Sequence, residues 1–109
     1  MKFDMNKMLQ EAQRMQAELA KAQEEAAGEI VEASAGGGMV TVKANGAGEV
    51  ISIAIDPRVI DPDDPELLAD LVLAAVNEAL RSARSLMESK VSGLIPGDLG
   101  GLGGLLPGG

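Results

Sequence analysis

The stretch Glu29–Pro57, EIVEASAGGGMVTVKANGAGEVISIAIDP, decides the fold, because it reads as three short strands joined by two glycine turns. Residues 40–45 and 51–56 alternate apolar and polar side chains, and residues 30–35 repeat the pattern more weakly. This period of two is typical of a β-sheet with one buried face. The side chains expected to point inward are Val31, Ala33, Ala35, Val40, Val42, Ala44, Ile51, Ile53 and Ile55.

The two glycine clusters are turn signals. Gly36-Gly37-Gly38 provides the positive φ values that a tight reversal needs, and Asn45-Gly46-Ala47-Gly48 is a typical hairpin sequence. We therefore predict a three-stranded antiparallel meander over residues 30–56.

A long helix is predicted before the meander, from about residue 4 to residue 27. Apolar side chains recur there every three or four residues, which is the pattern of a heptad seam facing a partner helix. Gly28 is the expected end of the helix. The seam consists of Met5, Met8, Ala12, Met15, Leu19, Ala22 and Ala26.

A second helix is predicted from about Asp64, where the aspartate can cap the first turn and Pro65 suits the first helical position. Apolar side chains from Leu68 to Met87 recur at helical spacing, and we expect them to cover the sheet. The fold class is therefore α+β, with the order α-β-β-β-α.

Residues 1–92 are predicted to form a single domain, followed by a flexible tail over residues 93–109. The tail holds eight glycines and two prolines among its leucines, a composition that does not support a regular helix. Phe3 is the only aromatic residue, so the core has to be built from small and aliphatic side chains. A thin core, open sheet edges and apolar helix faces together predict a homodimer or larger assembly.

Positive charge gathers on the two helices, although the net charge of the chain is −8. The meander and the loop after it, residues 29–65, carry seven acidic and two basic side chains. An acidic chain argues against nucleic-acid binding, which depends on Lys and Arg. The candidate phosphate contacts are Lys7, Arg14 and Lys21 on the first helix and Arg81, Arg84 and Lys90 on the second.

A second interpretation of these bases remains open. Each base of the first helix has a glutamate four residues later, so the column can be a solvated face that pairs with itself. The bases near the end of the second helix stabilise its dipole without any ligand.

The sequence lacks the usual means of catalysis, because it contains no His, Cys or Tyr. The acidic cluster Asp61, Asp63, Asp64 and Glu66 does not follow a calcium-loop pattern and fits a turn into a helix cap. Neither glycine cluster has the residues of a nucleotide-binding loop. We therefore expect no enzyme activity, metal, cofactor or small-molecule substrate.

No segment is apolar enough to suggest a membrane span or a secretory leader, and the absence of cysteine fits a reducing compartment. These features predict a cytoplasmic protein without a membrane partner.

Three strings resemble the YbaB/EbfC family of bacterial nucleoid-associated proteins. They are NKMLQEAQRMQAELAKAQEE in the first helix, SAGGGMVTVKANGAGEVISIAIDP in the meander and DPELLADLVLAAVNEALRSA in the second helix. The resemblance covers about residues 4–92, and its meander string is the most specific part.

The resemblance implies a tweezer-like homodimer that binds double-stranded DNA through its helices and organises the nucleoid or modulates transcription. It implies no catalytic residues and no short DNA-contact motif, so only the basic residues of the helices carry over. Two other hypotheses stay open: an acidic interaction module accessory to replication or recombination proteins, and a small structural oligomer.

Overall fold

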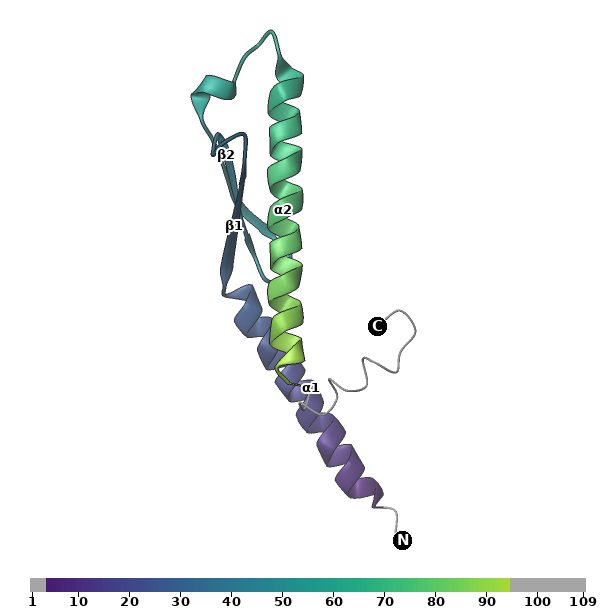
Figure 1. The fold of residues 1–109 in the computed structure, drawn as a ribbon. Coiled ribbons are helices and arrows are strands. Elements are labelled where there is room, and N and C mark those ends of the chain that lie inside the picture. Colours follow the sequence, from purple (N-terminus) through teal and green to yellow (C-terminus); the bar gives the residue numbers. More distant parts are fainter. Residues whose placement is uncertain (1–3, 95–109) are drawn as a thin grey trace.

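The computed structural model describes residues 4–94, which form two helices and one sheet (Figure 1). The elements in chain order are α1 (Met5–Ala27), β1 (Ile30–Ala35), β2 (Val40–Asn45), β3 (Val50–Ile55), the 3-10 turn η1 (Pro57–Val59) and α2 (Pro65–Ser92). The α+β class and the α-β-β-β-α order are confirmed. Helix α2 ends at Ser92, and residues 95–109 of the predicted tail lie outside the described residues, so the predicted domain limit stays a prediction.

The sheet is an antiparallel meander in the order β1-β2-β3. Gly36, Gly37 and Gly38 have φ values of 64°, 66° and 93°, which is the left-handed region that favours glycine. In the central strand, Val42 lies opposite Ala33 of β1 and Ile53 of β3. The predicted turn and strand pairing are therefore confirmed.

The core lies between α2 and the first two strands. Val40, Val42 and Ala44 of β2 have no solvent exposure. Opposite them, α2 presents Ala75 and Ala79, which are also fully buried. Because alanine is small, the helix axis approaches the sheet closely, and the larger side chains close the gap from the sides.

The predicted buried face is incomplete at β3: the prediction was wrong for Ile51 and Ile53, whereas Ile55 packs against the core. Ile53 is 46% exposed and Val50 is 40% exposed, although both lie across from buried residues of β2. A helix is about 10–12 Å wide and strands lie about 4.8 Å apart, so one helix covers two strands and leaves the third open. The alternation also breaks at Ile51, because Lys43 pairs with Ser52 and the next residue, Ala44, pairs with Val50.

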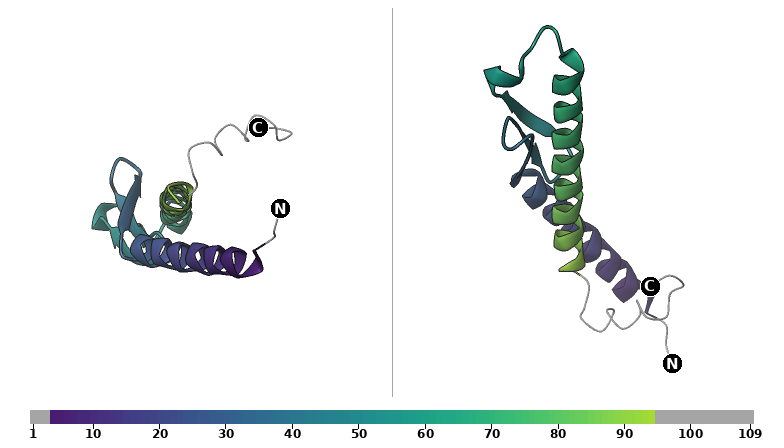
Figure 2. Two further views of the ribbon diagram at one scale, coloured as in Figure 1. Left: turned by 90° about the horizontal axis from the view of Figure 1, so that it is seen from below. Right: turned by 45° about the horizontal axis from the view of Figure 1, so that its top comes forward.

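Most of α1 projects away from this core. Its predicted limits are confirmed: the Asp4 side chain accepts a hydrogen bond from the Lys7 amide, and Gly28 follows the last helical residue. Of the predicted seam, only Ala22 and Ala26 are buried. The part of α1 nearest the N-terminus extends beyond the end of α2 (Figure 1), and when α2 is seen end-on, α1 lies across it (Figure 2). Within residues 4–94, no helix therefore packs against the outer part of the predicted seam, from Met5 to Ala12.

The hairpin between β2 and β3 fixes the inner end of α1. The Gly46 amide donates to the carbonyl oxygens of Ala26 at 2.9 Å and Glu29 at 3.3 Å. A Cβ at position 46 would lie 2.5 Å from the Ala26 carbonyl oxygen. Glycine is required here by this close approach, whereas Gly48, with φ of 85°, is required by its backbone conformation.

The beginning of α2 matches its predicted cap. The Asp64 side chain accepts a hydrogen bond from the Leu67 amide at 3.2 Å, and Pro65 is the first helical residue. Within residues 4–94, neither helix combines the length and the apolar character needed to span a membrane.

Candidate nucleic-acid interface

Three bases form a column along α1. Lys7, Arg14 and Lys21 are all exposed and follow one another at seven-residue intervals, which is about 10.5 Å along the helix axis. A rotation of about 100° per residue places them on one side of the helix, about 100° around the axis from Met8 and Met15. The column therefore presents positive charge over a length of about 21 Å.

The self-pairing that the sequence left open for this column does not form in the described structure. Within residues 4–94, the ion pairs shorter than 4.0 Å are Arg58–Asp56, Arg81–Glu78 and Lys90–Glu29. None of the bases of α1 is paired with the glutamate four residues later. Their charged groups are therefore open to an external anion, with the glutamates as neighbours on the same helix.

The bases of α2 lie in a more acidic setting. The Arg81 guanidinium is 2.6 Å from Glu78, and both side chains are more than half exposed. Arg84 follows three residues later and is exposed, and it makes no ion pair within the described part of the chain. Residues three apart on a helix are neighbours, so the two arginines share one outward side of α2.

Lys90 has a different environment from the other candidates. Its ammonium nitrogen is 2.9 Å from a carboxylate oxygen of Glu29, and its side chain is only 29% exposed. The hydrogen bond to Glu29 raises the pKa of Lys90, and the charge of Glu25 adds to the effect. The pair ties the last turn of α2 to the start of β1, so a phosphate would have to compete with Glu29 for this base.

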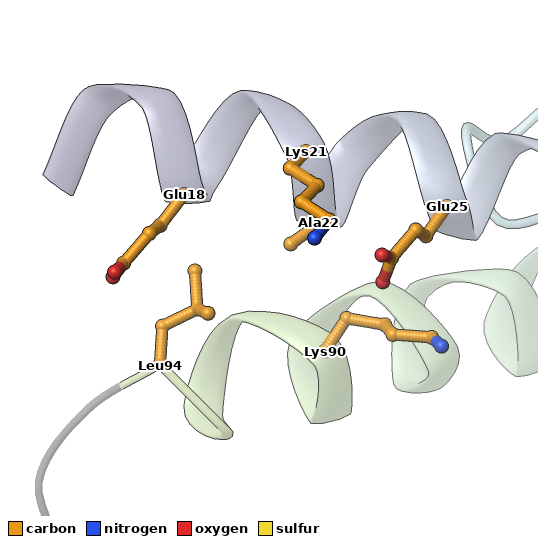
Figure 3. Close-up of a pocket in the computed structure, with 6 residues that line it drawn as sticks. All are labelled: Glu18, Lys21, Ala22, Glu25, Lys90 and Leu94. Atoms are coloured by element: carbon orange, nitrogen blue, oxygen red, sulfur yellow. The ribbon is translucent and has the colours of Figure 1, made fainter. Parts of the chain in front are cut away.

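One hollow brings together candidates from both helices. Lys21 and Lys90 line it with Glu18, Ala22, Glu25 and Leu94, where the end of α2 meets α1 (Figure 3). Lys7 and Arg14 line a separate shallow hollow with Gln10 and Glu11 on α1. The six predicted residues are thus spread over three places on the helices and do not form a single patch.

Two further bases lie on the body of the protein. Lys43 is exposed on the face of the sheet away from α2, and Arg58 in η1 contacts Asp56 through both its side chain and its backbone amide. The hydrogen bonds from the Arg58 side chain and then its backbone lower the pKa of Asp56 to about 2. Lys43 was visible in the sequence as a polar strand position, and nothing in its spacing distinguished it as a contact.

The candidate residues provide the chemistry of anion binding. In the described residues, no group of three or more acidic side chains is placed to hold a metal ion. The exposed bases can make salt-dependent contacts with phosphates.

Comparison with known proteins gives matches over most of the chain. A sequence model of the YbaB/EbfC DNA-binding family matches residues 1–99. A nucleoid-associated protein of Acetivibrio thermocellus is 50% identical over 102 residues, which cover 94% of this chain and 89% of that protein. A nucleoid-associated protein of Saccharopolyspora erythraea is 50% identical over 109 residues, covering 96% and 93% of the two chains.

The fold also has a counterpart among solved structures. The crystal structure of an uncharacterized Helicobacter pylori protein matches with a TM-score of 0.72 at 24% identity, and the match covers 81% of this chain and 92% of that one. The family model spans most of the sequence, and the relatives match over nearly their full length. This chain belongs to the YbaB/EbfC DNA-binding family.

Proposed function

We propose that this protein binds duplex DNA as a homodimer, with low sequence specificity, and that it organises the nucleoid or modulates transcription in the bacterial cytoplasm. The description of its family and the names of its relatives support DNA as the partner, in preference to an accessory module that never touches DNA. Those names also describe nucleoid-associated proteins rather than enzymes.

The unpaired basic column of α1 carries the proposal. Its bases stand about 10.5 Å apart along the axis, close to three base-pair steps of duplex DNA at 3.4 Å each. The column lies on the part of the molecule that projects furthest from the acidic loop at residues 56–66. DNA can therefore meet Lys7 and Arg14 without approaching that loop.

Low specificity follows from the side chains present. Residues 4–94 contain no aromatic side chain to stack on bases, and the candidate contacts are long cations suited to phosphates. Such contacts position a protein on DNA without reading its sequence.

The open face of β3 supports the homodimer. Val50, Ile51 and Ile53 are 40%, 53% and 46% exposed, next to a strand edge that pairs only with β2 within the described chain. An exposed apolar edge strand is a template for pairing with another chain. A second copy placed against β3 would bury these side chains and complete the sheet face that α2 leaves open.

The dimer is tested with two variants of neighbouring residues on β3. Ile53→Glu places a charge on the open apolar face, and we expect light scattering to show a monomer. Ser52→Glu is the matched control, because residue 52 points to the opposite face and lies across from Lys43. A stable dimer of Ile53→Glu would exclude β3 as the interface.

DNA binding is tested by fluorescence anisotropy with a labelled duplex over a salt series. Affinity should fall steeply with salt, and Lys7→Glu should lower both the affinity and the salt slope, by about 0.9 for each phosphate that the variant no longer neutralises. Lys43→Glu is the matched control, because it makes the same charge change on the outer face of the sheet.

The two variants distinguish a local contact from a general effect of charge. Equal losses for Lys7→Glu and Lys43→Glu would show that only the net charge matters. Absence of binding by the unchanged protein at low salt would refute direct DNA binding.

A further inference from the structure

The outer part of α1 carries an apolar stripe that nothing covers in the described structure. Met5, Met8 and Leu9 are 64%, 53% and 57% exposed, and Met15 and Leu19 continue the stripe at 46% and 38%. Exposing several large apolar side chains in one continuous row is unusual for a soluble protein, and such rows mark interaction sites.

The stripe is hollowed along its length. One hollow is lined by Met5, Met8, Leu9 and Ala12. The second is lined by Met15, Gln16 and Leu19 of α1 together with Val91 and Leu94 at the end of α2. Gln16 is the one polar residue in either lining, so the occupant has to be apolar.

The chain itself enters the second hollow. The last turn of α2 ends at Ser92, and the Leu94 amide donates to the Val91 carbonyl at 3.0 Å, which keeps the chain beside the helix end. The Leu94 side chain is half-buried and points toward α1 (Figure 3). The first apolar side chain after α2 thus already lies against the stripe.

The residues that follow have the right composition and length to continue. Residues 95–109 contain a single ionisable side chain, Asp98, and five large apolar ones: Ile95, Leu99, Leu102, Leu105 and Leu106. Fifteen residues span up to about 50 Å when extended, whereas the stripe from Leu19 back to Met5 is about 21 Å long. The segment can therefore reach every part of the stripe.

We propose that residues 95–109 dock along the apolar stripe of α1 in the same chain, with Leu94 as the anchor. The leucines fill the two hollows, and the intervening glycines let the backbone follow the helix surface. Ordering so many glycines has a high entropic cost, so docking is reversible. The stripe lies on a different side of α1 from Lys7 and Arg14 and away from β3, so docking along its outer part needs neither bound DNA nor the proposed dimer. Only the anchor Leu94 borders candidate DNA contacts, Lys21 and Lys90.

Because the chain contains no cysteine, paired cysteines can test the docking in the full-length protein. Gly100→Cys introduces a thiol between two leucines of the segment. It is combined either with Ala12→Cys, on the stripe, or with Ala17→Cys, about 140° away around the helix. Both alanines are exposed, and six residues beyond Leu94 span up to roughly 20 Å. Leu94 lines a hollow with Met15, and both alanines lie within about 5 Å of Met15 along the axis of α1.

The measurement is the rate of intramolecular disulfide formation with oxidised glutathione, followed by non-reducing electrophoresis and mass spectrometry. Docking predicts a rate about tenfold higher for the Ala12 pair, which corresponds to a preference of about 1.4 kcal/mol. Basic side chains near position 17 favour the reactive thiolate form of a cysteine there. On its own, this effect would make the Ala17 pair form its disulfide faster, which is the opposite of what docking predicts.

Adding Leu99→Ser and Leu102→Ser to the Ala12 pair should remove the preference. Equal rates at positions 12 and 17, or a preference that survives these serines, would overturn the proposal. Disulfides formed mainly between two chains would also overturn it, because they would assign the stripe to a second copy. DNA affinity measured on the same uncross-linked variants should be unchanged, which separates this test from the proposed function.

Discussion

Replacing Gly46 with alanine tests how α1 is fixed to the sheet. The new Cβ would lie 2.5 Å from the Ala26 carbonyl oxygen and 2.8 Å from the Ala26 Cβ. These neighbours belong to the last turn of α1 and cannot rotate away as a flexible side chain could. Gly46→Ala therefore has to push the end of α1 away from the hairpin and weaken the 2.9 Å hydrogen bond from residue 46 to Ala26.

The expected cost follows from these contacts. Forcing one extra carbon into a tight contact costs about 1–3 kcal/mol, and the weakened hydrogen bond adds about 1 kcal/mol. The lower entropy of the unfolded chain with alanine offsets about 0.4–1 kcal/mol. We expect a net loss of about 2 kcal/mol in the free energy of unfolding, or about 8–16 °C in Tm for a domain of this size.

Thermal and urea unfolding, followed by circular dichroism at one fixed protein concentration, measure this loss. Gly28→Ala is the matched control, because Gly28 also has a negative φ and a Cβ there would make only ordinary contacts, the nearest at 3.5 Å. We expect the control to be as stable as the unchanged protein or slightly more stable. Equal stability of Gly46→Ala and Gly28→Ala would refute the close-packing argument.

Three other predictions concern polar contacts. Arg58→Gln should return the pKa of Asp56 from about 2 toward 3.8, as measured by NMR of its carboxyl carbon. Because folding lowers this pKa, the Asp56 carboxylate stabilises the folded protein above about pH 3.8. That stabilisation is lost as the pH falls through about 2. A double-mutant cycle with Glu29→Gln and Lys90→Met should show a small favourable coupling in urea unfolding, as for other partly exposed pairs, and no coupling would mean that the pair does not hold α2. Asn45→Ala should cost about 1–3 kcal/mol, because it removes the buried oxygen that accepts from two backbone amides of the following turn at 3.0 and 3.1 Å, and Asn45→Asp, which keeps that oxygen, should cost less.

Local signals predicted the elements well. Asp64 and Pro65 marked the start of α2, Gly28 marked the end of α1, and Gly36 to Gly38 formed the expected turn. Each of these signals acts within a few residues of chain, through capping hydrogen bonds or allowed φ values. Such effects are readable without knowledge of the neighbouring elements.

Contacts between elements were not readable in the same way. The alternation at Ile53 predicted a buried side chain, but burial depends on whether a helix lies over that strand, and α2 lies over β1 and β2. The close contact of Gly46 with the end of α1 could not be predicted either, because the sequence gives no sign that the Ala26 carbonyl lies against it.

The sequence predicted which helices carry the candidate bases, and it did not predict which of these bases form ion pairs. The bases on α1 and α2 stand on the expected helices, and the sequence could not tell that Lys90 reaches Glu29, sixty-one residues earlier in the chain. The side-by-side charges of α1 suggested pairs that do not form in the described structure. Which of these bases contact DNA stays a prediction.

The way α1 is attached has a consequence for the reach of its bases. The helix is held at one end, near Ala26, and Lys7 stands nineteen residues away, about 28 Å along the axis. A tilt of about 10° at the attachment displaces Lys7 by about 5 Å, more than one base-pair step. With the Gly46–Ala26 contact as the pivot, such a tilt in the proposed dimer would change the distance between the two α1 helices, and with it the fit to curved or straight DNA, while the sheet stays unchanged.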